Sequence, residues 1–186
     1  MSAFFDEIGD AQRAFIAAQP VFFVATAAAG ARINLSPKGM DSFRVLGPKR
    51  VAYLDVGGSG NETQAHLTAD GRITIMFCAF DNPALILRLY GQGAYMLAGT
   101  PGYDALAGNF PRLPGARQIF DIAVDSLQES CGWGVPHMNF DRERKTLAKF
   151  HAQQDPAERL AVIAMRNRSI DGLPVTVQTV MPPWDD

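Results

Sequence analysis

The sequence has no run of basic residues and no long apolar stretch, and its 186 residues carry a net charge of −2. A surface that binds nucleic acid needs an excess of Lys and Arg to contact phosphates, so nucleic-acid binding is not expected. No stretch reaches the ~18 apolar residues of a membrane-spanning helix, and the first residues lack the basic segment of a signal peptide. These absences predict a cytoplasmic protein without a membrane or nucleic-acid partner.

Cysteine and histidine are also scarce, with two and three copies. Cys78 and Cys131 are too few for a disulfide framework, which fits a reducing compartment. His66, His137 and His151 lack the spacing of zinc ligands, so no metal site is expected. The sequence contains no G-x-S-x-G motif, and no residue stands out as a catalytic acid, base or nucleophile.

What the sequence does contain is a series of short apolar runs bounded by Gly, Pro, Asn and Asp. Runs of this kind, rich in Val, Ile and Phe, predict strands joined by hairpins. Strands are expected at 21–29, 31–36, 44–47, 50–56, 72–80, 84–97 and 116–130, and helices at 6–19, 62–68, 142–154 and 155–169, with a short one within 100–110.

The pattern predicts one domain, 1–186, that is mainly β with peripheral helices. An antiparallel barrel of about six strands is expected over residues 20–131, with C-terminal helices over residues 139–170. The regular alternation of strands and helices that a Rossmann fold requires is missing.

The stretch "LDVGGSGNETQAHL", residues 54–67, places a glycine-rich turn between a strand and a short helix. The turn has neither the G-x-G-x-x-G motif nor the G-K-[ST] ending of a P-loop. Glycines nevertheless let a backbone approach a ligand closely, and free N–H groups at a helix start favour an anion. One interpretation is a phosphate site. The other is a capping box in which Ser59 is the N-cap and Glu62 is the N3 residue.

Five segments, "INLSPKGMDSF", "GSGNETQAHL", "LRLYGQG", "CGWGVP" and "SIDGLP", follow one another along the chain. Together they resemble the pyridoxamine 5′-phosphate oxidase-like family of FMN-binding split barrels, and more closely a bacterial branch related to that oxidase. The resemblance implies a Greek-key split barrel and a homodimer with FMN at the subunit interface. It implies that the FMN phosphate is bound by Gly58, Ser59, Gly60, Asn61, Glu62 and Thr63.

The charge of this turn differs from that of the oxidase. The oxidase has Ser-Arg-Lys-Ala here, whereas this sequence has Ser59-Gly60-Asn61-Glu62, so two cations are replaced and an acid is added. A phosphate dianion then needs cations from other parts of the chain. Lys38, Arg44 and Arg88 are the expected candidates.

Two further segments are expected to line the flavin. From the resemblance, Ser36, Lys38 and Gly39 line the ring, where a cation near the N1–C2=O edge stabilises the reduced form. Trp133, Val135 and Pro136 would cover the isoalloxazine from the segment "CGWGVPHM". The alternatives are a polar hairpin loop at 34–41 and a tight turn at 131–138 with its tryptophan packed on the barrel. His137 is either a proton donor or an exposed histidine.

The resemblance implies an FMN-dependent oxidoreductase that moves hydride between the flavin and a small-molecule substrate or a nicotinamide. Two alternatives remain open at this point. The protein could be a non-catalytic flavin carrier or sensor, which fits the lack of acid and base residues, or the same barrel could bind deazaflavin F420 or haem. Oxidation of pyridoxamine phosphate itself is not expected, because the C-terminal segment "SIDGLPVTVQTVMPPWDD" lacks the charged residues that hold that substrate.

Overall fold

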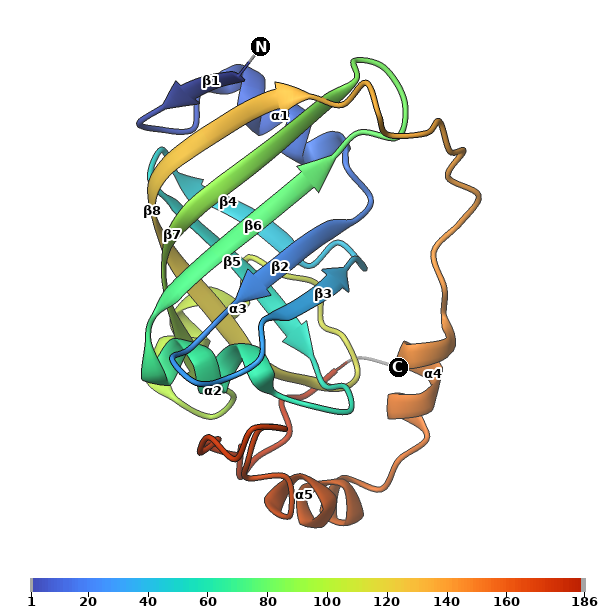
Figure 1. Cartoon of the computed structure of the whole chain (residues 1–186). Helices are drawn as coiled ribbons and strands as arrows, with labels where there is room; N and C mark the ends of the chain where they lie inside the picture. The colour runs from blue at the N-terminus through green and yellow to red at the C-terminus, as the bar shows by residue number, and fades with distance from the viewer. Residues whose placement is uncertain (1, 185–186) are drawn as a thin grey trace.

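The computed structural model describes residues 2–184 as a curled antiparallel sheet with helices at its periphery (Figure 1). The fold class predicted from the sequence, a mainly β antiparallel barrel with peripheral helices, is confirmed. Within these residues the sheet has eight strands rather than about six. They are β1 (Ser2–Phe5), β2 (Phe22–Thr26), β3 (Asn34–Lys38), β4 (Phe43–Gly47), β5 (Arg50–Val56), β6 (Arg72–Cys78), β7 (Leu85–Leu97) and β8 (Ala116–Cys131).

The strands follow the order β3-β2-β6-β7-β8-β5-β4, and β1 pairs with β8. One edge of β8 pairs with β7 along nearly its whole length, whereas the other edge pairs first with β5 and then with β1. Strand β1 was not predicted because its four residues are all exposed, so it has no alternation between buried and exposed positions.

The barrel interior is filled by the alternate side chains of its strands, as the two-residue period of a strand requires. Tyr53 of β5 stacks on Phe120 of β8 with ring centroids 4.9 Å apart. Phe22 and Phe77 meet the ring of Phe43 edge-on at 5.0 Å. These aromatic contacts join both ends of the sheet order, and they hold the curled sheet together from within.

In the described part of the chain, five helices lie outside the barrel: α1 (Asp10–Ala18), α2 (Glu62–Ala69), α3 (Pro101–Ala107), α4 (Thr146–Ala152) and α5 (Pro156–Ala164). Helix α3 covers the outer face of β5, where its Tyr103 and Leu106 pack with Ala52 and Leu54. This second apolar layer explains why β5 is buried on both faces.

Among residues 2–184, no helix combines the length and apolar character needed to cross a membrane.

Residues 132–184 form an extension that we call the C-terminal arm. The arm leaves the barrel at the end of β8, runs along its outside and reaches the opposite end, where α2 lies (Figure 1). There Gln64 of α2 is bonded to the backbone of Thr176 through both its amide atoms, at 2.9 Å and 2.7 Å. The arm is therefore fastened beside the glycine-rich turn that precedes α2.

Candidate functional site

A β-bulge in β8 brings two consecutive side chains to one buried carboxylate. Gln118 pairs with Asp55 of β5, and Ala116 pairs with the residue that follows it, so Arg117 is an extra residue without a partner on β5. An extra residue of this kind interrupts the alternation of a strand and redirects its side chain. The Nε atom of Arg117 and the Nε2 atom of Gln118 consequently both donate to Oδ2 of Asp55, at 2.5 Å and 2.9 Å.

A third side chain, that of Lys38 on β3, also reaches the carboxylate of Asp55. The Nζ atom of Lys38 lies 3.6 Å from Oδ1 of Asp55, whose side chain is only 3% exposed. Burial raises the pKa of Asp55, but the charges of Arg117 and Lys38 and the hydrogen bonds from Gln118 and Arg117 outweigh it, so the pKa lies below its ordinary value. Asp55 is therefore ionised at neutral pH.

The same cluster extends to the glycine-rich turn, residues 57–60. Gln118 donates to the side-chain oxygen of Asn61 at 2.8 Å, which joins Asp55 to the start of α2. The carbonyl groups of the turn accept from side chains of three later segments: Gly57 O from Nε2 of His151 (2.7 Å), Gly58 O from Nη1 of Arg166 (3.2 Å) and Gly60 O from Nη2 of Arg117 (2.8 Å).

The amide groups of the turn are arranged differently from its carbonyls. The N–H of Gly57 is bonded to Gly115 O at 2.9 Å. The N–H groups of Gly58, Ser59 and Gly60 have no hydrogen-bond partner among the described residues 2–184. Free amides followed by a helix start are the elements of an anion site.

The capping-box interpretation of this turn is wrong. The N-cap of α2 is Asn61 rather than Ser59, it has no side-chain cap bond, and Glu62 is the first helical residue. The carboxylate of Glu62 instead accepts from the backbone N–H of Ile170 in the C-terminal arm, at 3.0 Å and 3.2 Å. The acid that the sequence adds to the turn is thus engaged with the arm.

Of the three cations expected to serve a phosphate here, only Lys38 belongs to the cluster. Arg44 is paired with Asp41 and donates to Asn109 O at 2.6 Å. Arg88 donates to the hydroxyl of Ser130 at 3.0 Å, on β7 and β8. Arg44 and Arg88 are therefore held by partners outside the turn. The cations that bond to the turn are Arg117 and Arg166.

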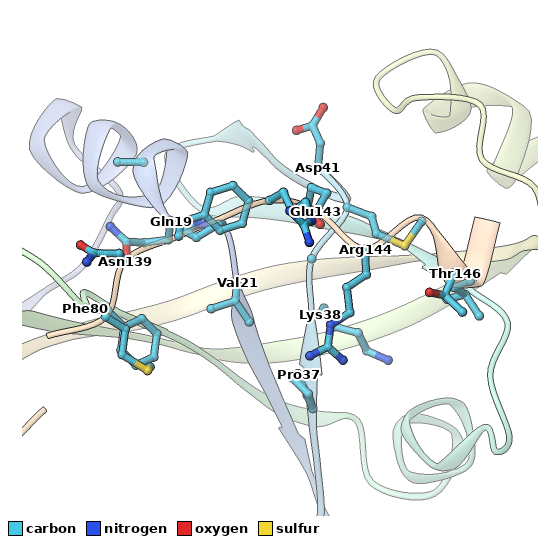
Figure 2. Close-up of a pocket in the computed structure, with 18 of the residues that line it drawn as sticks. Gln19, Val21, Pro37, Lys38, Asp41, Phe80, Asn139, Glu143, Arg144 and Thr146 are labelled. Carbon is cyan, nitrogen blue, oxygen red and sulfur yellow. The ribbon is translucent and has the colours of Figure 1, made fainter. Parts of the chain in front are cut away.

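A pocket of about 1300 Å³ lies between the barrel and the C-terminal arm, and Lys38 lines it together with Gly39 (Figure 2). This volume exceeds the about 300–1,000 Å³ of common ligand pockets. The barrel side of the wall comes from the end of α1 and residues 19–21 after it, from the end of β3 with the loop that follows, and from residues 80–81 after β6. The arm contributes residues within 138–150. Figure 2 shows the side chain of Arg144 of the arm extending towards Lys38.

Several residues expected to bind flavin lie away from this pocket wall. Trp133 is 84% exposed, and neither it nor Val135 or Pro136 lines the pocket. His137 is exposed as well. Ser36 is half-buried on β3 and is not part of the wall. In a single chain, these side chains therefore do not meet the predicted site.

Thr63 is likewise turned away from the turn. It is buried, and its hydroxyl accepts from Nδ2 of Asn34 at 3.2 Å.

Among residues 2–184, no group of three or more His, Cys, Asp or Glu side chains gathers in a way that could hold a metal ion.

Sequence reasoning missed Asp55, Arg117 and the arm's contacts with the turn. Asp55 carried a signal, because it shares the buried face of β5 with Val51 and Tyr53, and a carboxylate there must be paired. Arg117 carried no such signal, because strict alternation of side chains along β8 places Arg117 and Gln118 on opposite faces of the strand. The contacts of the arm depend on tertiary packing alone.

Comparison with known proteins defines the class of this chain. The sequence model of the family described as pyridoxamine 5′-phosphate oxidase matches residues 8–131. The chain belongs to this family. A pyridoxamine 5′-phosphate oxidase family protein of Aspergillus flavus, ustO, is 37% identical over 196 aligned residues, which cover 94% of this chain and 78% of that protein.

Solved structures show the same fold at lower identity. The HupZ protein of Group A Streptococcus superposes with a TM-score of 0.51 at 22% identity, covering 64% of this chain and 91% of that chain. A substituted variant of HupZ gives a TM-score of 0.53 at 23% identity, over 66% of this chain and 99% of that chain. In both comparisons about a third of this chain lies outside the shared fold.

Proposed function

We propose that the protein is a flavoprotein that binds FMN and acts as an oxidoreductase on a small-molecule substrate or a nicotinamide. One observation carries this proposal. Lys38 and the turn at 57–60, which the resemblance assigns to FMN, are distant in the sequence but are joined through Asp55 and its partners. Family membership and the large pocket beside Lys38 support the same function.

The residues present fit a phosphate-bearing flavin. The free amides of Gly58, Ser59 and Gly60 and the adjacent Arg117 and Arg166 suit a phosphate. The pocket wall supplies apolar side chains, including Val21, Phe80 and Phe140, for a flat ring. When bound, the flavin supplies the redox chemistry, and the protein binds and orients it and sets its electrostatic surroundings.

The active unit in this proposal is a cytoplasmic homodimer with FMN at the subunit interface. The arm side of the pocket leaves large apolar side chains in solvent: Phe140 is 62% exposed, Phe150 55% and Met138 54%. Exposed apolar side chains gathered at a pocket are typical of an interaction surface. A second copy of the chain would cover them and bring the exposed Trp133 towards a flavin.

A non-catalytic flavin carrier or sensor is the second candidate function. No His, Cys or Tyr lines the pocket among the described residues, and the ionisable groups of its wall are carboxylates, Arg and Lys. The same composition provides no His, Cys or Tyr axial ligand for haem. The absence of a histidine, the side chain that most often transfers protons near neutral pH, favours binding without turnover.

The absorption spectrum of the purified protein tests the flavin assignment, followed by release of the chromophore and its identification by mass. Stoichiometric FMN supports the proposal. A colourless protein that takes up no added FMN contradicts it. Addition of NADH or NADPH without oxygen then separates the two candidates, because a reductase or oxidase loses its yellow colour and regains it in air, whereas a carrier stays yellow.

A further inference from the structure

Arg159 is a buried cation with an unused donor. It is 6% exposed and is the one buried residue of α5, whose apolar Val162 remains 43% exposed. Its Nη2 atom donates to Gly115 O at 2.9 Å. Its Nη1 atom is buried and has no hydrogen-bond partner among residues 2–184. Helix α5 thus buries an arginine more deeply than its apolar side chains. Burial of a cation costs free energy, and a partner for the cation offsets that cost.

A second cation stands beside it. Burial, and then the charge of Arg117, lower the pKa of Arg159. Arg117 shares Asp55 with Lys38, and no carboxylate of residues 2–184 forms an ion pair with Arg159. Among the described residues that these contacts join to the turn, Lys38, Arg117, Arg159 and Arg166 carry four positive charges, against two negative charges on Asp55 and Glu62. The surplus of two matches the charge of a phosphate monoester.

The glycine-rich turn lies against both guanidinium groups. A Cβ atom at Gly57 would lie 2.9 Å from Nη2 of Arg159 and 3.8 Å from Cδ of Arg117. The unpaired amides of residues 58–60 follow directly in the chain. An anion at this place would meet backbone N–H groups next to two guanidinium groups, whose positive charges favour it.

We propose that Arg159 of the C-terminal arm, together with Arg117, binds a phosphate monoester dianion at the turn formed by residues 57–60. The inference rests on the proposed function, because it assigns this dianion to the phosphate of FMN. Helix α5 lies outside the residues 8–131 that the family model matches. The arm therefore supplies the positive charge that the turn itself lacks, and binding of the phosphate fixes the arm against the barrel.

Binding of FMN and of riboflavin, which lacks the phosphate, tests this inference by fluorescence titration. The wild-type protein is expected to bind FMN at least about 100-fold more tightly than riboflavin, and Arg159→Gln is expected to lose about 10-fold or more of the FMN affinity. Riboflavin affinity should not change in the variant. Arg168→Gln is the matched control, since Arg168 lies on the same arm but bonds only to Gly172 O among the described residues.

Limited proteolysis gives a second measurement that does not depend on the variant folding. Riboflavin and FMN would both cover the arm residues 138–150 that line the pocket, so the readout is cleavage within α5. In the wild-type protein, FMN is expected to protect Pro156–Ala164 from cleavage, whereas riboflavin is not. Inorganic phosphate at constant ionic strength should also protect the arm and should weaken FMN binding but not riboflavin binding.

Each result has a distinct meaning. Equal affinities of FMN and riboflavin in the wild type, or an FMN affinity that Arg159→Gln leaves unchanged, overturn the inference and leave the flavin assignment standing. A wild type that binds neither flavin overturns the proposed function. In that case, arm protection by inorganic phosphate would support a phosphate site for another ligand, and its absence would overturn the site as well.

Discussion

Lys38 and Asp55 form an ion pair, with 3.6 Å between Nζ and Oδ1, although their strands are not neighbours in the sheet. Strand β3 ends the sheet order on one side, and β5 is the last strand but one on the other. The pair therefore crosses the open seam between the two ends of the curled sheet. It also connects the pocket, which Lys38 lines, to the glycine-rich turn.

Replacement of Asp55 by Asn should destabilise the fold strongly. The change leaves Lys38 and Arg117 without their shared carboxylate, and loss of one partner of a buried ion pair costs about 3–5 kcal/mol. Urea unfolding measures the free energy of unfolding. The control is Asp121→Asn, which breaks the more exposed pair with Arg50 between the same strands. It should cost less than about 1 kcal/mol. Equal costs for the two variants would contradict a special role for Asp55.

The stabilisation from Asp55 should disappear in acid. Its pKa is lower in the folded protein than the ordinary value of 3.8, so the folded state binds fewer protons than the unfolded state in this range. The contribution is complete above that ordinary value and is lost as pH falls through the folded pKa. The difference in unfolding free energy between wild type and Asp55→Asn should therefore be constant near neutral pH and shrink below about pH 4. A difference that stays constant to the lowest pH would refute the linkage.

Gly115→Ala should release the C-terminal arm. Gly115 has φ +90°, and an added Cβ would overlap the ring of His151. Gly172→Ala is the control, because Gly172 has φ +81° but open space around it. Both changes carry the about 1–2 kcal/mol penalty of a left-handed backbone, and only the first adds a steric clash. Faster proteolysis within residues 132–184 of Gly115→Ala alone is the expected result.

Glu62→Gln should strengthen binding of a phosphate-bearing flavin. The substitution removes a negative charge next to the turn and keeps an acceptor for the N–H of Ile170. One charge in a partly solvated site contributes about 1 kcal/mol, which corresponds to about a fivefold gain in FMN affinity. Riboflavin affinity should not change, and neither should FMN affinity in the exposed control Glu7→Gln. Weaker FMN binding in Glu62→Gln would place the phosphate elsewhere.

Charges at the exposed pocket rim should split the proposed dimer. Phe140→Glu and Phe150→Glu each place a carboxylate on a surface that the second subunit would cover, so sedimentation should show monomers. Phe4→Glu changes an equally exposed phenylalanine, 69% accessible, on β1 and should leave a dimer. The reverse outcome would locate the interface at β1, and a monomeric wild type would remove the dimer altogether.

The parts of the fold that follow local rules could be predicted from the sequence. Alternating and continuous apolar runs gave β5 to β8 to within a few residues, and the Asp155-Pro156 pair marked the start of α5. Expected strands at 21–29 and 31–36 were displaced, because β2 ends at Thr26 and β3 begins at Asn34. The alanine-rich residues between them are apolar but pair with no strand.

The candidate site was predictable only in part. The glycine-rich turn was predicted because glycines let a backbone approach a ligand closely, and Lys38 was predicted from the resemblance. The role of Arg117 depends on a bulge, which a sequence pattern does not reveal. Arg159 lies in a helix that was expected from the sequence, but its burial follows from how the arm docks.

The hydrogen bonds of Gly115 also bear on the order in which the parts of the molecule fold. Its carbonyl accepts from Gly57 of the turn and from Arg159 of the arm, so this contact needs three segments that are far apart in the chain. Contacts between such distant segments form slowly, and a growing chain completes its N-terminal parts first. The barrel can therefore fold while the arm is still being synthesised. The proposed anion site would then be the last part of the molecule to form, and a chain truncated after β8 would have a barrel without it.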